Sequence, residues 1–292
     1  SCPLKRKKGK GQITQYAIRN THDISRFTFY ASRSLIMKRL LELNVLLVFL
    51  FLYAPIFTLI VFSFNASQQT AVWKGFTLSW YGKLAQNQDL WAACRNSLIV
   101  AGISTLIATV IGTMAALAIE RYRFPLRLTF TRVLYLPIII PDIVMAIALL
   151  LFYMQTHLPL GITSIIIAHV AFNISYVTIV VRARLRGFDQ SLEEAALDLG
   201  ANEWTTFRQI TLPLIAPGVI GGGVLAFTIS IDDFVITFFT AGVGSTTLPV
   251  RIYSMLKFGM TPEINAISTL LLFNSIFFVL LSLRLRGGSQ SL

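Results

Sequence analysis

Three aspartates stand inside long apolar stretches of the sequence, where a charged side chain is costly. Asp142 follows Pro141 in one stretch, while Asp232 and Asp233 are neighbours in another. Ionisable residues within a membrane tend to line a solute pathway or to pair with another group. We therefore expect the three carboxylates to line a pathway for a positively charged solute. The alternative is that they cap a broken helix or hold a second subunit.

The side chains of the two neighbouring aspartates are not expected to face the same surroundings. Successive residues on a helix differ in facing by about 100°, so Asp232 and Asp233 must point to different surroundings. No Lys or Arg lies at a comparable depth in the apolar stretches to neutralise them. One of the pair is then expected to face the pathway, and the other a neighbouring helix or the outer interface.

A polar loop at residues 187–213 carries a second set of residues with meaningful spacing. Ser191 and Glu194 predict a capping box at the start of a short helix, and Gly200 can end that helix in a left-handed conformation. Asn202 can cap a second short helix, after which a proline opens the next apolar run. The first helix has a small apolar face, which permits close approach by another surface. The plainer alternative is an interfacial helix resting on lipid.

These residues must be positioned by apolar runs that are long enough to cross a bilayer, for which a helix needs about 20 residues. Backbone groups inside a bilayer must be satisfied within the segment, so each run is predicted to be a helix. The chain is therefore predicted to be an all-α, polytopic membrane protein with about six transmembrane helices. The predicted spans cover approximately residues 43–64, 97–119, 133–155, 162–181, 214–241 and 264–283.

The composition favours a membrane protein and excludes several other classes. Hydrophobic residues make up 55% of the 292 residues and charged residues 13%, whereas soluble domains carry roughly 25% charged residues. Two cysteines are too few for a disulfide scaffold, and no set of His or Cys residues predicts a metal site. The sequence contains no phosphate-binding loop of the P-loop type, so the chain is not expected to be an ATPase.

The basic residues predict the orientation of the chain in the membrane. Of 25 Lys and Arg residues, 20 lie in the N-terminal tail, the second and fourth loops and the C-terminal tail, and five lie in the other loops. Loops rich in Lys and Arg stay in the cytoplasm, so both termini are predicted to be cytoplasmic. Orientation thus accounts for most of the net charge of +12. The expected charged partner is the lipid bilayer, with no nucleic-acid partner.

The chain is predicted to have three parts. Residues 1–36 form a basic N-terminal extension without an apolar repeat, either disordered or upstream of the natural start, since Met37 directly precedes the first span. Residues 37–286 are predicted to form the transmembrane domain, with the polar loop at 187–213 facing the cytoplasm. Residues 287–292 form a short C-terminal tail.

The polar loop matches the EAA motif position for position: Glu-Ala-Ala, three residues, Gly, nine residues, Ile, one residue and Leu-Pro. The chain therefore resembles the permease subunits of bacterial importers that use an ATP-binding cassette (ABC) ATPase and a substrate-binding protein. This resemblance implies a type I, MetI-like permease architecture and a loop that acts as the coupling helix on the ATPase. The matching residues are Glu194, Ala195, Ala196, Gly200, Ile210, Leu212 and Pro213.

The same resemblance implies the partners and cofactors. Two copies of the ATPase subunit, a homologous second permease and an extracytoplasmic substrate-binding protein are expected in the bacterial inner membrane assembly. ATP and Mg²⁺ would be bound by the ATPase, so this chain is expected to bind no cofactor and to carry no catalytic residue.

Three further stretches are similar to the permeases of spermidine/putrescine importers within this group. They begin with Pro141-Asp142, with Phe227 and with Leu248, and the second contains the paired aspartates. The resemblance implies a polyamine substrate, and the acidic residues agree with a polycation. The alternatives are a permease for iron, another cation or an anion, and an ion-coupled secondary transporter that uses one of the paired aspartates. The last alternative leaves the loop motif unexplained.

A pair of glycines predicts a site of close helix packing. Gly218 and Gly222 are four residues apart in the fifth predicted span, and small residues at this spacing let two helices approach closely. We expect this face to pack against the second permease, with packing inside the chain as the alternative.

Overall fold

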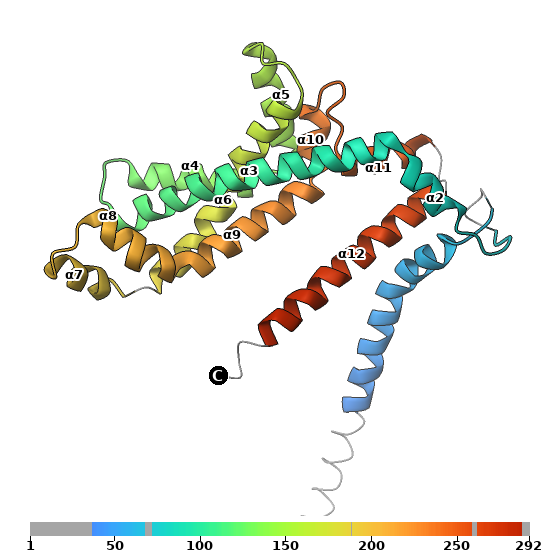
Figure 1. The fold of residues 1–292 in the computed structure, drawn as a ribbon, viewed down its shortest axis with the longest axis horizontal. Helices are drawn as coiled ribbons and strands as arrows, with labels where there is room; N and C mark the ends of the chain where they lie inside the picture. The colour runs from blue at the N-terminus through green and yellow to red at the C-terminus, as the bar shows by residue number, and fades with distance from the viewer. Residues whose placement is uncertain (1–36, 68–71, 188, 259–261, 288–292) are drawn as a thin grey trace, which may run out of the picture.

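The computed structural model describes residues 37–67, 72–187, 189–258 and 262–287. Helices dominate this part of the chain (Figure 1) because apolar runs satisfy their backbone groups internally. In chain order they are Met37–Phe62, α2 (Ser79–Gln86), α3 (Gln88–Arg121), α4 (Arg127–Ile139), α5 (Asp142–Gln155), α6 (Ile162–Arg186), α7 (Ser191–Asp198), α8 (Glu203–Thr206), the π-helical turn η1 (Phe207–Thr211), α9 (Leu212–Asp232), α10 (Val235–Thr240), α11 (Leu248–Phe258) and α12 (Pro262–Gly287).

Four helices among the described residues are long and apolar enough to cross a membrane: Met37–Phe62, α3, α6 and the continuous helix Glu203–Asp232. The pair α4 and α5 is a fifth candidate, in two pieces. The sixth predicted span falls within α12, whose apolar part within the described residues is Pro262–Phe273. The all-α membrane architecture is thus confirmed, with four or five candidate spans by length and composition among the described residues.

The third predicted span is not a straight helix. α4 and α5 are bent by 109° relative to each other, and α5 stands out from the bundle in Figure 1. Pro141 lies at the bend, and a proline drives the residue before it out of the helical region. Ile140 accordingly has an extended backbone, with ψ at 132°. Pro137, by contrast, lies within α4 without ending it.

The fifth predicted span also breaks. α9 ends at Asp232, Asp233 is extended with ψ at 123°, and the short helix α10 follows. The expectation of one helix through residue 241 was therefore wrong. α10 packs beside α5 and α6, where Ala146, Ala168, Phe172 and Ile236 form a buried apolar cluster. Both helix breaks consequently adjoin the same part of the molecule.

The centre of the fold is a bundle of α3, α6 and α9. Val177 and Val181 of α6, Ala116 of α3 and Ile215 of α9 are buried together in its core. The helices approach closely because glycines stand at the crossings: a Cβ placed on Gly112 would lie 2.8 Å from Cβ of Val177. The loops and the broken helices extend from this closely packed bundle.

Gly218 and Gly222 belong to this bundle, which corrects the expected contact with a second permease. A Cβ on Gly218 would lie 2.8 Å from Cβ of Arg184, and a Cβ on Gly222 would lie 3.3 Å from Cγ1 of Val177. Both neighbours are on α6 of the same chain. The glycine face of α9 is therefore already covered, and the alternative of packing within the chain is the one observed.

Two helices lie apart from the bundle. Met37–Phe62 and α12 extend away from it in Figure 1, and the most apolar window of Met37–Phe62 has no buried residue. Near the α2 end, the indole of Trp80 donates a hydrogen bond of 2.8 Å to the carbonyl of Asn65 and packs with Ala266 of α12. The N-terminal extension at 1–36 and the residues after 287 lie outside the described part.

Candidate functional site

The loop at 187–213 forms the predicted helix–turn–helix, with differences at its start and in its second helix. α7 ends at Asp198, and Gly200 follows with φ at +88°, a conformation that favours glycine. The side chain of Asn202 accepts a hydrogen bond of 2.8 Å from the backbone N–H of Thr205, as a helix cap does. These two predictions are confirmed.

The predicted capping box at Ser191 was wrong. Ser191 is the first residue of α7, and the preceding residue makes no side-chain cap. Instead, the backbone N–H of Ser191 donates to Oδ1 of Asp189 at 3.0 Å. This hydrogen bond lowers the pKa of the Asp189 carboxyl. The carboxylate of Asp189, two residues before Ser191, is thus the hydrogen-bond acceptor at the start of α7, where the sequence predicted the hydroxyl of Ser191.

The second helix of the loop is not separate from the fifth span. A continuous helix runs from Glu203 to Asp232, with a π-helical turn at Phe207–Thr211 inside it. Pro213 comes two residues after this turn. A proline removes a helical hydrogen bond and crowds the carbonyl four residues before it, and a π-turn is a local adjustment of the helical register. The part of the loop from Glu203 onward is therefore continuous with the membrane-spanning part of α9.

The motif residues divide into exposed and inward-facing positions. Glu194 and Ala195 are exposed, and Ala196 is buried. Leu212 and Pro213 are also exposed, whereas Ile210 is half-buried. The exposed positions of α7 point away from the chain, as expected of a surface that a partner covers.

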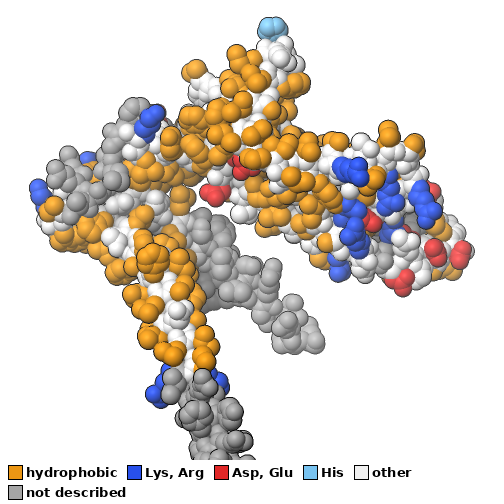
Figure 2. All heavy atoms as spheres, turned by 180° about the vertical axis from the view of Figure 1, so that it is seen from behind, with side chains coloured by type: hydrophobic (Ala, Val, Ile, Leu, Met, Phe, Trp, Pro, Cys, Tyr) orange, Lys and Arg blue, Asp and Glu red, His pale blue; other side chains and the backbone are white. Residues whose placement is uncertain are grey.

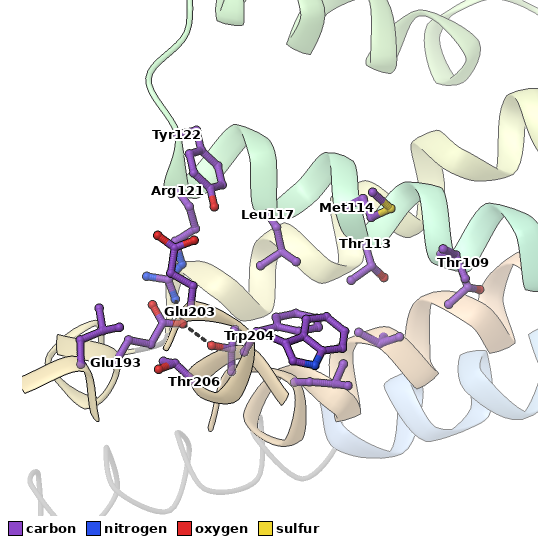
Figure 3. Close-up of a pocket in the computed structure, with 16 residues that line it drawn as sticks. Thr109, Thr113, Met114, Leu117, Arg121, Tyr122, Glu193, Glu203, Trp204 and Thr206 are labelled. Carbon is purple, nitrogen blue, oxygen red and sulfur yellow. Dashed lines mark hydrogen bonds and ion pairs between the residues drawn. The ribbon is translucent and has the colours of Figure 1, made fainter. Parts of the chain in front are cut away.

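Glu193 is a functional candidate that the motif did not identify. Its Oε1 lies 2.9 Å from Nη2 of Arg121 and accepts a 2.5 Å hydrogen bond from the hydroxyl of Thr211. Figure 3 shows Glu193 and Arg121 pointing toward each other at one side of a groove of about 960 Å³ between α3, α7, α8 and α9. Two adjacent glutamates on a helix differ in facing by about 100°, so the sequence indicates only that Glu193 and Glu194 have different surroundings.

Asp233 does not face an open pathway, since its side chain is about 10% exposed. Its carboxylate accepts hydrogen bonds from the backbone N–H of Thr237 at 2.8 Å and from the Thr237 hydroxyl at 2.9 Å. A third bond of 3.3 Å comes from the N–H of Ile236. The first N–H groups of a helix have no partner within it, so Asp233 stabilises the start of α10. The alternative that these acids cap a broken helix is therefore correct for Asp233.

His169 is the partner that sequence reasoning missed for Asp233. Its Nε2 lies 3.3 Å from Oδ2 of Asp233 and 3.0 Å from the Thr237 hydroxyl. Its Nδ1 lies 2.6 Å from the hydroxyl of Ser230, which in turn lies 3.1 Å from the hydroxyl of Ser104. His169 is fully buried. The break between α9 and α10 is thus held by a polar network that joins α3, α6, α9 and α10.

Of the three aspartates in the apolar stretches, Asp232 and Asp142 are exposed. Asp232 is the last residue of α9 and Asp142 the first residue of α5, so each stands at a helix break. Neither side chain forms an ion pair or hydrogen bond within the described part of the chain. Figure 2 shows acidic side chains among hydrophobic ones near the base of the protruding α5. These two carboxylates are therefore available to a cation.

The arrangement combines exposed carboxylates at helix breaks with a surface helix held by charged contacts. In the described ranges, no three His, Cys, Asp or Glu residues are placed to hold a metal ion. Exposed carboxylates at breaks in membrane helices, together with a surface helix that contacts two spanning segments through Glu193, are features of a membrane permease.

The chain belongs to the family of binding-protein-dependent transport system inner membrane components, whose model matches residues 108–286. It is 43% identical over 235 residues to the spermidine/putrescine transport system permease protein PotC of Haemophilus influenzae, covering 80% of this chain and 91% of that protein. It is 41% identical over 235 residues to the putrescine transport system permease protein PotI of Escherichia coli K12, covering 78% of this chain and 84% of that protein.

The solved structures agree on the fold. A bacterial ABC transporter involved in the import of the acidic polysaccharide alginate superposes with a TM-score of 0.63 at 17% identity, covering 85% of this chain and 95% of that chain. The type I, MetI-like permease architecture is thereby confirmed. The chain is a transport subunit and not an enzyme, and it resembles PotC as the sequence predicted.

Proposed function

We propose that this chain forms half of the translocation pathway of an ATP-driven importer for polyamines such as spermidine and putrescine. The observation that carries the proposal is the exposure of Asp142 and Asp232 at two neighbouring helix breaks, in a chain similar over four fifths of its length to polyamine permeases. A polyamine has several positive charges and needs carboxylates along its route. Asp233 contacts His169 and α10, and it serves the same route by fixing the position of α10 beside it.

The orientation follows from the basic residues. Arg121, Arg123, Arg182 and Arg186 lie where α3 ends, α4 begins and α6 ends, and Figure 2 shows basic side chains gathered at one end of the molecule. This end faces the cytoplasm of a bacterium, because Lys and Arg are retained there. Both termini are then cytoplasmic in the inner membrane.

The coupling loop meets the ATPase through its exposed positions. Glu194 and Ala195 of α7 and the turn at Gly200 form the outer surface of the loop. Ala195 is small and allows close packing in a cleft of the ATPase. The charged side chain of Glu194 beside it can form one directed polar contact there. The ATPase, in two copies in the assembly, binds ATP and Mg²⁺, and this chain transmits the resulting movement without binding either.

A second, homologous permease completes the pathway. The helix Met37–Phe62 has no buried residue in its most apolar window, and it stands apart from the α3–α6–α9 bundle together with α12 (Figure 1). A solitary apolar helix in a membrane gains packing contacts only by meeting another protein surface. An extracytoplasmic binding protein delivers the substrate at the end opposite α7.

Stimulated ATP hydrolysis by the reconstituted assembly tests the substrate. The complex of this chain, its companion permease, the ATPase and the binding protein is placed in lipid nanodiscs. Spermidine or putrescine is expected to raise hydrolysis several-fold, and Asp232→Asn to shift the response to higher polyamine concentrations. Stimulation by an iron complex or an inorganic anion, with no response to polyamines, contradicts the substrate assignment.

A further inference from the structure

α7 is a short helix with little buried surface. Ala196 is the one buried residue of its eight, and these eight residues are all described. A helix of this length is not stable in isolation, so neighbouring segments must fix its position. The contacts that attach α7 to the bundle therefore decide how a force applied to it is passed on.

Glu193 attaches α7 to two other segments through a single oxygen. Its Oε1 lies 2.9 Å from Nη2 of Arg121, the last residue of α3. The same atom accepts a hydrogen bond from Thr211, the last residue of the π-helical turn that leads into α9. The two charged side chains are only 16% and 18% exposed, so solvent screens this pair less than a fully exposed one.

The residue before Arg121 extends the link to α6. Glu120 accepts hydrogen bonds from Nε of Arg182 at 2.7 Å and from Nε of Arg186 at 3.3 Å. Arg182 also donates to the hydroxyl of Tyr135 on α4. Consecutive residues at the end of α3 thus connect it to α6 and to α7, and the network reaches α4.

We propose that Glu193 clamps the coupling helix to the spanning helices, so that α7, the end of α3 and the start of α9 move as one body. This inference rests on the proposed coupling to an ATPase. Glu193 is a positioning residue, because it acts on the pathway through α3 and α9. Its neighbour Glu194 is exposed and has a separate role toward the partner. Hydrogen-bond and ion-pair networks of this kind can carry energetic coupling between distant sites.

The coupling ratio, the number of ATP molecules hydrolysed per polyamine imported, tests the clamp in proteoliposomes. Glu193→Gln keeps the side-chain volume and removes the charge, and it is expected to raise the ratio several-fold. The charge-swapped pair Arg121→Glu with Glu193→Arg is expected to return the ratio toward the wild-type value. Arg132→Gln, which removes an exposed charge on α4 outside the coupling loop, serves as the control and is expected to leave the ratio unchanged.

A merely structural role predicts a different pattern. Loss of folding or assembly lowers hydrolysis and import together, and it leaves the ratio of the surviving complexes unchanged. An unchanged ratio in assembled Glu193→Gln complexes overturns the proposal. A charge-swapped pair that is no better than either single variant overturns it as well.

A distance measurement tests the clamp without reference to the substrate. Spin labels are placed at Leu199 beside α7 and at Leu106 of α3, both well exposed, after Cys2 and Cys94 are replaced by serine. In the wild-type assembly the distance is expected to be the same with and without trapped ATP, and in Glu193→Gln it is expected to change. A nucleotide-dependent change in the wild type overturns the clamp. If the distances behave as expected but polyamines are not imported, the substrate assignment fails and the clamp stands.

Discussion

Nε2 of His169 and Oδ2 of Asp233 lie 3.3 Å apart in the interior of the helix bundle, 64 residues apart in sequence. The pair joins α6 to the break between α9 and α10, and Thr237 contacts both members. This relationship assigns different roles to two neighbouring aspartates. Asp233 fixes the shape of the break, and Asp232, the residue before it, is left exposed.

Removing the Asp233 carboxylate is expected to destabilise the chain. Asp233→Ala leaves buried partners without a hydrogen bond, which costs about 1–3 kcal/mol, and it removes the cap of α10, worth about 1 kcal/mol. Thermal unfolding in detergent is expected to show a Tm lower by several degrees. Asp233→Asn keeps an oxygen acceptor and is expected to lose less. Equal Tm values for wild type and Asp233→Ala contradict the structural role.

Asp232 and Asp142 are expected to affect transport rather than stability. Both side chains are exposed and unpaired within the described residues, and surface substitutions of this kind change stability by less than about 0.5 kcal/mol. A hydrogen bond to a charged group contributes roughly 1.5–3 kcal/mol, so Asp232→Asn should raise the KM for polyamine uptake about tenfold or more. An unaltered KM in both Asp232→Asn and Asp142→Asn would place the pathway elsewhere.

The glycine face of α9 gives a stability prediction with an internal control. Gly218→Ala places a Cβ 2.8 Å from Cβ of Arg184, whereas the nearest atom to a Cβ on Gly221 is 3.9 Å away. Overpacking costs typically about 1–3 kcal/mol, and alanine is about 0.5–1 kcal/mol better than glycine in a helix. Gly218→Ala should therefore lower the Tm, and Gly221→Ala should keep or raise it. A higher Tm for Gly218→Ala than for Gly221→Ala would contradict the close packing of Gly218 against α6.

Asn202 provides a local test of the coupling loop. Its side chain accepts the hydrogen bond of the Thr205 amide, and loss of a helix cap costs about 1 kcal/mol. In Asn202→Ala the Thr205 amide is expected to exchange with solvent roughly five times faster, because about 1 kcal/mol corresponds to that factor. Gln209→Ala, an exposed change in the same helix, is the control. Equal exchange at Thr205 in both variants would show that the cap does not hold the turn.

Sequence alone predicted the elements that depend on local chemistry. The apolar runs predicted the membrane helices, Gly200 predicted the turn, and Asn202 predicted the cap. Each of these depends on a residue type and its immediate neighbours. The similarity of the loop to the EAA motif also identified the family before any packing was known.

The features that sequence reasoning missed depend on residues far apart in the chain. Glu193 is paired with Arg121, 72 positions earlier, and Asp233 with His169. Spacing alone does not tell which of two adjacent acids faces the interior. Gly218 and Gly222 predicted close packing correctly but did not specify the partner helix, which is α6. The break at Asp233 lacked the proline that marks the break at Pro141.

Uptake of radiolabelled spermidine and putrescine into proteoliposomes containing the whole assembly tests the central claim most directly. Uptake is expected only with ATP and the binding protein present. It should be lost in Glu194→Lys, which places a reversed charge on the coupling surface, and reduced in Asp232→Asn while the complex stays assembled. Uptake that proceeds on an ion gradient without ATP, or an assembly that hydrolyses ATP while excluding both polyamines, contradicts the account.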